Sequence, residues 1–323
     1  MNQSPRIVTL LPSATEIVCA LGFEDRLVGR SHECDFPRSV ERVPALTEPK
    51  FNPEGTSAQI DERVKKIVGD ALSVYRVDAA RLRELRPEVI VTQSQCEVCA
   101  VSERDVEAAV AEWLGARPQI VSLAPYGLDD IFTDMQRVAD ALGAHARGTE
   151  LVDRLRARLT SIAEKALGAS ERPTVATIEW IDPLMAAGNW MPTLVEMAGG
   201  VNLFGNAGEH SPWMKFEELV AKDPDVILIL PCGFGMDRAA KDLPALTNRP
   251  DWNALKAVRA RRVFMADGNQ YFNRPGPRVV ETLQIITEIL RSVREASPPV
   301  DAPEELARLA QGTGWRQWRH ALS

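Results

Sequence analysis

Two short segments of the 323-residue chain gather side chains that could bind a metal ion or take part in redox chemistry. Residues 31–37 read SHECDFP and residues 94–99 read SQCEVC, and they supply His32, Cys34, Gln95, Cys96 and Cys99. The Cys-x-x-Cys spacing of Cys96 and Cys99 fits a zinc site or a redox pair. His-x-Cys is shorter than the common spacing of zinc ligands, so a pocket lined by free thiols ranks first, a metal site second and a redox disulfide third.

His32 has two interpretations that the sequence leaves open. A neutral imidazole is a common metal ligand, so His32 could bind a cobalt or iron centre axially. It could instead be a polar residue of a cleft that is hydrogen-bonded to the backbone.

A second group of candidate residues is mostly aromatic and follows strands predicted in the C-terminal half. The segments after these strands contain Trp180, Trp190, Phe234, Tyr271, Phe272 and Arg274. Aromatic residues make up only 6% of the chain, so this concentration indicates a pocket for a bulky, rigid, partly apolar ligand. Trp180 could instead be buried structure, and Arg274 could fix the conformation of its loop.

Strands alternate with helices along the chain, and these elements must position the candidate residues. Apolar strands are predicted at 6–12, 26–31, 89–92, 119–123, 174–180, 223–230 and 261–267. This alternation indicates parallel sheets covered by helices on both faces. In such sheets ligands bind beyond the carboxyl ends of the strands, which is where both groups of candidates fall.

The first helix has clear predicted limits. Ser13 and Glu16 have the spacing of a capping box, and Gly22 marks the end of the helix.

An α/β fold of two Rossmann-like lobes joined by one long helix accounts for this pattern. The segment that joins the lobes is helical nearly throughout, with weak points at Gly143 and Gly148. The C-terminal segment reads as a charged helix that Trp315 and Trp318 pin to the body. The predicted divisions are a first lobe at 1–126, a linking helix at 127–168, a second lobe at 169–292 and a helical appendage at 293–323.

Composition excludes several classes of function. The net charge is −7, which argues against nucleic acid as the main partner because such proteins cluster lysine and arginine. No run of eighteen apolar residues predicts a transmembrane segment. A nucleotide cofactor is not expected, since no strand–GxGxxG–helix unit is present. No nucleophile–base pair stands out, so we expect no catalytic residues.

The chain resembles the helical-backbone (cluster A, class III) substrate-binding proteins of ABC importers for cobalamin and ferric siderophores, most closely the cobalamin branch. The resemblance covers about residues 6–292. It rests on RIVTLLPSATEIVCALGFEDRLVGRSHECDFP, LRELRPEVIVTQ, DPDVILIL and YFNRPGPRVVETL, which occur in the order of the family.

The resemblance implies a ligand held between two lobes, with a single stiff linking helix that permits only a small closure. It places Tyr271 and Arg274 at positions that contact the ligand, and Trp180 beside another. It also implies docking to an ABC permease through an acidic residue on each lobe. Glu217 matches the second acidic position, whereas Ala80 occupies the first.

We therefore expect a non-catalytic, monomeric binding protein for cobalamin or a related corrinoid that requires no cofactor. It would be the substrate-binding component of an ABC importer or a soluble intracellular relative. The alternatives are a metal-binding or redox protein that uses His32, Cys34, Cys96 and Cys99, or a binder of ferric siderophores or haem. A native start at Met1 predicts a cytoplasmic protein, and removal of a signal peptide predicts a periplasmic one.

Overall fold

The computed structural model divides the chain into two compact units, each with its own sheet. It describes residues 5–69, 74–95, 103–110, 117–168, 171–295 and 314–318. Unit 1 comprises Met1–Gly55, Gln59–Pro125 and Asp129–Leu155, and unit 2 comprises Thr56–Ala58, Tyr126–Leu128 and Arg156–Ser323.

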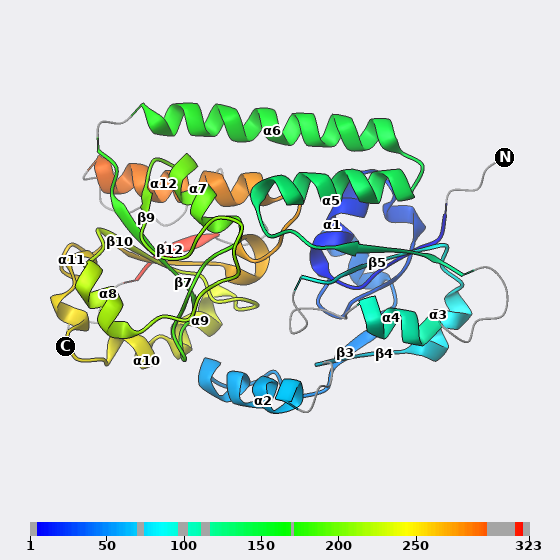
Figure 1. Ribbon diagram of the computed structural model, residues 1–323, viewed down its shortest axis with the longest axis horizontal. Helices are drawn as coiled ribbons and strands as arrows, with labels where there is room; N and C mark the ends of the chain where they lie inside the picture. Colours follow the sequence, from blue (N-terminus) through cyan, green and yellow to red (C-terminus); the bar gives the residue numbers. More distant parts are fainter. Residues whose placement is uncertain are drawn as a thin grey trace. The chain divides into compact units, whose positions relative to one another are not determined.

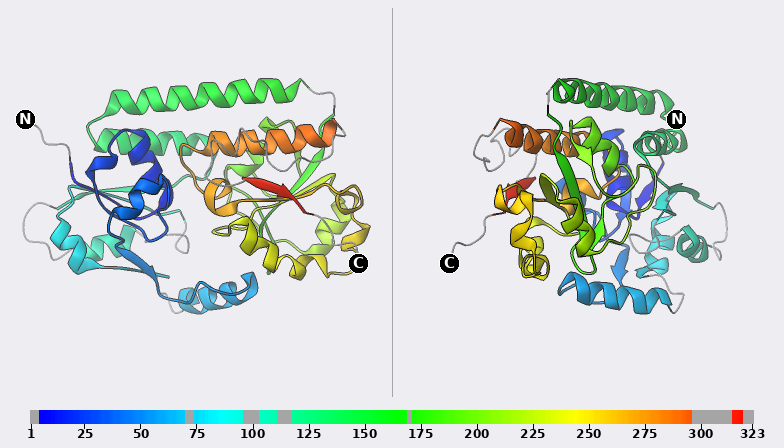
Figure 2. Two further views of the ribbon diagram at one scale, coloured as in Figure 1. Left: turned by 180° about the vertical axis from the view of Figure 1, so that it is seen from behind. Right: turned by 60° about the vertical axis from the view of Figure 1, so that its left-hand side comes forward.

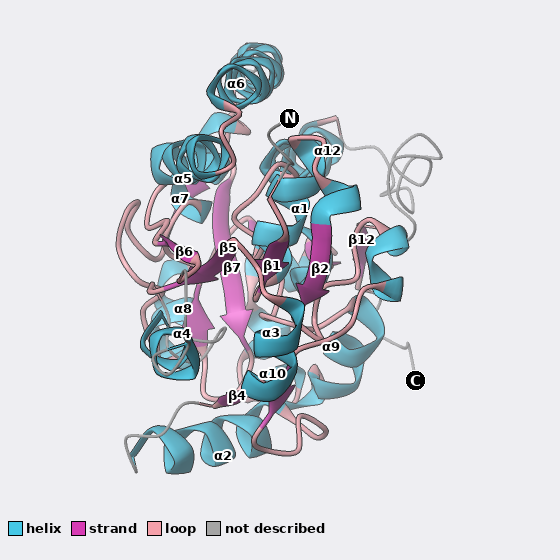
Figure 3. Cartoon of the chain, turned by 90° about the vertical axis from the view of Figure 1, so that its right-hand side faces the viewer, coloured by secondary structure: helices cyan, strands magenta, loops and turns pink. Residues whose placement is uncertain are grey.

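Unit 1 contains a four-stranded parallel sheet in the order β2-β1-β5-β6 (Figure 3). Its strands are β1 (Ile7–Thr9), β2 (Leu27–Arg30), β5 (Val89–Gln93) and β6 (Gln119–Leu123). All five residues of β5 are buried, which explains the continuous apolar run in the sequence. All four strands lie where they were predicted.

The other elements of unit 1 are helices and one further pair of strands. A short antiparallel pair, β3 and β4, forms a separate two-stranded sheet. The bounds are α1 (Pro12–Ala20), η1 (Glu24–Arg26), η2 (Arg38–Arg42), β3 (Thr47–Pro49), α2 (Ser57–Gly69), β4 (Tyr75–Val77), α3 (Ala79–Leu85), α4 (Glu103–Val110) and α5 (Leu128–Ala141). A core that includes Val8, Leu82 and Ile90 joins the sheet to these helices.

Unit 2 contains a second sheet in the order β12-β11-β10-β7-β8, with β9 also paired to β7. Strands β7, β9, β10 and β11 run parallel, whereas β8 and β12 run antiparallel to their neighbours. The strands are β7 (Thr174–Trp180), β8 (Met185–Ala186), β9 (Val201–Asn202), β10 (Val226–Ile229), β11 (Val263–Ala266) and β12 (Trp315–Gln317).

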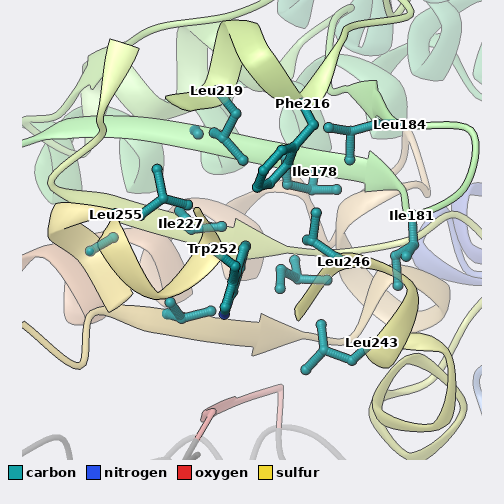
Figure 4. Packing of buried hydrophobic residues seen from close by; sticks show 14 of the residues in the cluster. Ile178, Ile181, Leu184, Phe216, Leu219, Ile227, Leu243, Leu246, Trp252 and Leu255 are labelled. Atoms are coloured by element: carbon teal, nitrogen blue, oxygen red, sulfur yellow. The ribbon is translucent and has the colours of Figure 1, made fainter. Parts of the chain in front are cut away.

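Helices and short turns complete unit 2. They are α7 (Met191–Met197), α8 (Phe216–Lys222), α9 (Met236–Asp242), α10 (Pro244–Thr247), η3 (Trp252–Ala254), α11 (Lys256–Arg259), the π-helical η4 (Gly268–Phe272) and α12 (Val279–Arg294). A core centred on Trp252 and Phe216 packs against Ile178 and Ile227 of the sheet (Figure 4).

The long linking segment is two helices rather than the one that was predicted. Helix α5 ends before Gly143, whose φ of 66° is left-handed, and α6 (His145–Leu167) then begins (Figure 1). A glycine in this conformation ends a helix, because a side chain there would be strained. Gly148, the other predicted weak point, lies within α6. Helix α6 itself runs from unit 1 into unit 2.

Two further local predictions are wrong. Helix α1 begins at Pro12, which is well suited to the first helical position, so Ser13 lies inside the first turn and forms no capping box. Residues Trp315–Gln317 are strand β12, paired with β11, and not helix (Figure 2). Trp315 and Trp318 do contact the body, since their rings pack edge-on against those of Phe264 and Trp252.

None of the helices in the part of the chain that the structure describes is both long enough and apolar enough to cross a membrane.

Candidate functional site

His32 follows β2 at the carboxyl edge of the unit 1 sheet and is held there by Thr47 of β3. The Thr47 Oγ1 atom lies 2.7 Å from His32 Nδ1 and accepts the His32 backbone N–H at 3.0 Å. The His32 ring also packs on Tyr75, with 5.5 Å between ring centroids. No described residue hydrogen-bonds His32 Nε2. Partial burial, with a contribution from Arg30, lowers the pKa of His32 and favours the neutral imidazole.

Cys34 is buried in unit 1, deeper than a residue that contacts a ligand would be. Its side chain is 1% exposed, and its Sγ atom accepts a hydrogen bond from Thr15 Oγ1 at 2.9 Å. Thr15 Oγ1 also lies 2.7 Å from Thr9 Oγ1. Cys34 therefore belongs to a buried chain of hydrogen bonds that reaches the end of β1.

The second cysteine segment is only partly described. Gln95 follows β5 at the same edge and is half-buried. Cys96 and Cys99 lie outside the described residues, so the predicted four-residue metal cluster stays a prediction. Among the described residues, no group of three or more His, Cys, Asp or Glu side chains could hold a metal ion.

In unit 2, hydrogen bonds join the loops that follow three parallel strands at their carboxyl ends. The Cys232 N–H, after β10, donates to the Glu179 carbonyl at the end of β7 at 3.0 Å. The Asn269 N–H, after β11, donates to the Phe234 carbonyl at 3.1 Å. The candidates that the sequence placed after separate strands are therefore brought together at one edge of this sheet.

Trp180 and Phe234 form the aromatic part of this edge. Their rings meet edge-to-face with 5.2 Å between centroids. Trp180 is half-buried and Phe234 is 2% exposed. The Arg238 guanidinium lies over the Phe234 ring, 4.0 Å from its centroid, where it gains a cation–π interaction. Of the two rings, Trp180 therefore offers the larger accessible surface.

The other predicted residues of unit 2 are more deeply buried than Trp180. Trp190, Tyr271, Phe272 and Arg274 are 6%, 4%, 0% and 4% exposed. Phe272 therefore packs in the core. Arg274 Nη2 donates to Asn269 Oδ1 at 3.2 Å, so part of its guanidinium fixes the loop after β11.

Tyr271 and its polar neighbours lie in this loop and next to it. The Arg278 guanidinium lies 5.2 Å from the centroid of the Tyr271 ring. Burial nevertheless raises the pKa of the Tyr271 hydroxyl. Burial likewise raises the pKa of Asp267, although the Gln270 backbone N–H donates to its Oδ1 atom at 2.8 Å.

Glu179 and Ser211 are site residues that the sequence did not single out. Ser211 Oγ donates to Glu179 Oε2 at 2.9 Å, at the carboxyl end of β7. Burial raises the pKa of Glu179 to about 7. An acidic residue inside the apolar run TVATIEW was the available signal, but its partner lies 32 residues further along the chain.

The two positions that the resemblance links to permease docking lie on separate units. Glu217 is exposed in the first turn of α8, in unit 2. Ala80 is exposed on α3, in unit 1.

Comparison with known proteins identifies the family. A model of the family described as periplasmic binding protein matches residues 7–269, which is more than half of the chain. An uncharacterised ABC transporter substrate-binding lipoprotein of Bacillus subtilis is 23% identical over 89% of this chain and 80% of its own length. A vitamin B12-binding protein of Vibrio cholerae serotype O1 is 24% identical over 88% of this chain and 89% of its own length.

Solved structures share the fold. A periplasmic haem-binding protein from Roseiflexus sp. RS-1, in its apo form, superimposes with a TM-score of 0.65 at 22% identity, over 90% of this chain and 99% of that one. The parallel sheets of the two units and the family match agree on the fold. The chain belongs to the periplasmic binding protein family.

Proposed function

We propose that the chain is the non-catalytic substrate-binding component of an ABC importer and that its ligand is cobalamin or a related corrinoid. The family match supports binding rather than catalysis. Relatives named as a substrate-binding lipoprotein and as vitamin B12-binding proteins support the transport role, the ligand class and a location outside the cytoplasm. A permease that docks at Glu217 is part of this proposal.

The observation that carries the ligand class is the environment of His32. In the Nδ1–H tautomer, Thr47 Oγ1 accepts the ring proton and the Nε2 lone pair remains available to a metal centre. The lowered pKa keeps the imidazole in the neutral form that can ligate. A corrinoid supplies a metal at the centre of a large, mostly apolar ring, which also suits the half-buried Trp180.

A second candidate ligand is haem. The structural similarity to a haem-binding protein favours it, and His32 Nε2 could ligate iron as well as cobalt. The separate proposal of a metal or redox protein depends on Cys96 and Cys99.

Titration of the metal-free protein with aquocobalamin tests the proposal through tryptophan fluorescence and the visible spectrum of the corrinoid. Aquocobalamin has an exchangeable axial water, so ligation by His32 should shift its spectrum. We expect saturable binding and a shift that is lost in His32→Ala. His145→Ala is the matched control, because its imidazole is exposed on α6.

The outcomes separate the candidates. Binding without a spectral shift would retain the corrinoid and remove His32 as a ligand. Saturable binding of haem alone would replace the corrinoid by haem. The absence of binding of either macrocycle, together with stoichiometric zinc lost on Cys96→Ser, would favour the metal protein.

A further inference from the structure

The side chain of Glu179 has one oxygen that Ser211 engages and one that has no hydrogen-bond partner among the described residues. Ser211 Oγ donates to Oε2 at 2.9 Å, and the same hydroxyl oxygen accepts the Gly188 N–H at 3.0 Å. The hydroxyl proton of Ser211 is therefore directed at Glu179. Ser211 is 4% exposed, so this pair is fixed within the protein.

The second oxygen, Oε1, has no hydrogen-bond partner among the described residues. Glu179 as a residue is only partly buried, and Oε1 is not one of the fully buried, unpartnered side-chain oxygens of the described residues. Oε1 therefore remains in reach of a molecule at the carboxyl end of β7, next to Trp180. A carboxylate oxygen in that position is an unused acceptor.

No cation among the described residues compensates the charge of Glu179. Burial raises its pKa to about 7, the bond from Ser211 acts in the opposite direction, and no charged side chain contributes. The titratable groups on the adjoining segments are Asp182, Glu209, His210, Cys232 and Arg238. Arg238 instead lies over the Phe234 ring, and His210 Nδ1 is 2.9 Å from the Ser211 carbonyl oxygen.

We propose that Glu179 Oε1 accepts a hydrogen bond from an N–H group at the rim of the ligand, and that it selects amide-bearing macrocycles over carboxylate-bearing ones. This inference rests on the proposed function and specifies the chemistry of the ligand rim. An amide N–H supplies the donor that the carboxylate lacks. A ligand carboxylate would instead place a second negative charge beside an acid whose charge no described cation compensates.

Two corrinoids that differ chiefly in these groups give the sharpest test. Dicyanocobinamide carries amides and dicyanocobyrinic acid carries carboxylates, and both have cyanide at the axial positions, so ligation by His32 does not interfere. Their dissociation constants are measured between about pH 5.5 and about pH 8.5, on either side of the pKa of Glu179.

We expect the two ligands to respond to pH in opposite directions. Affinity for dicyanocobinamide should rise by about tenfold as Glu179 ionises, because a charged acceptor makes the stronger hydrogen bond. Affinity for dicyanocobyrinic acid should fall over the same range. In Glu179→Gln both profiles should be flat and the preference for the amide ligand should shrink.

Two further variants make the result specific. Glu209→Gln removes an exposed acid from the same loop as Ser211 and should keep both wild-type profiles. Ser211→Ala leaves the carboxylate in place but removes the bond that lowers its pKa, so both profiles should keep their slopes and move to higher pH.

The inference fails if the wild type has flat profiles, or if Glu179→Gln retains the wild-type slopes, while both proteins still bind dicyanocobinamide. A wild type that binds neither these ligands nor aquocobalamin overturns the proposed function, and this inference with it. The two failures are therefore distinguishable.

Discussion

At the scale of single residues, the most informative group is the carboxylate of Glu179, because it should affect stability as well as binding. Its pKa is raised from 4.5 in the unfolded chain to about 7 in the folded protein. The folded state therefore retains the proton while the unfolded state releases it. The contribution of this retained proton to the stability of the folded state is fully present below about pH 4.5 and is lost as the pH rises to about 7.

Glu179→Gln should consequently stabilise the protein at high pH only. We expect its free energy of unfolding to exceed that of the wild type by about 2–3 kcal/mol at about pH 8, and by much less at about pH 5. Urea denaturation at both pH values measures the difference. A gain of equal size at both would show that charge burial is not its cause.

Thr47 offers a second test at this scale. Its hydroxyl accepts the His32 N–H and also hydrogen-bonds His32 Nδ1 and Ser31 Oγ, and the residue is 7% exposed. Thr47→Val keeps the shape but leaves these groups without that partner, so we expect a loss of about 1–3 kcal/mol of stability. Thr149→Val, on the exposed surface of α6, should cost less than about 0.5 kcal/mol. Equal losses in the two variants, measured by urea denaturation, would contradict this role.

At the scale of elements, β12 shows where sequence reasoning reached its limit. Buried parallel strands such as β5 and β10 are continuous apolar runs, and these were predicted correctly. The segment of β12 contains Arg316 and Gln317 and has no such run. It is a strand because β11 offers it a backbone edge, which local sequence does not reveal.

The candidate site, too, could be predicted from the sequence only in part. Residues after strand ends could be located from the sequence, because sheet topology dictates where those ends meet. The sequence could not give the depth of Cys34 and Phe272, which depends on packing against distant segments. The pairing of Glu179 with Ser211 was missed for the same reason.

The contribution of β12 to stability can be measured through Trp315. This residue is 2% exposed and its ring packs 5.7 Å from that of Phe264, centroid to centroid. Trp315→Ala should destabilise the protein by about 3–5 kcal/mol. Trp213→Ala is the matched control, because Trp213 is 56% exposed. This substitution should lower the free energy of unfolding by less than about 1 kcal/mol. A loss for Trp315→Ala no larger than that for the control would show that β12 is not a stable part of the sheet.

At the scale of the whole molecule, each unit has a sheet and a buried cluster of its own. The cluster of unit 1 includes Leu82, and that of unit 2 includes Trp252, and both residues are 0% exposed. A unit with its own core unfolds cooperatively. We therefore expect two transitions in differential scanning calorimetry.

Core variants in each unit should assign these transitions. Leu82→Ala removes buried volume in unit 1 and should lower the midpoint of one transition, and Trp252→Ala should lower that of the other. Losses of several kcal/mol correspond to shifts of about 5–15 °C for domains of this size. A single transition that both variants shift equally would mean that α6, which continues from one unit into the other, couples them into one cooperative structure.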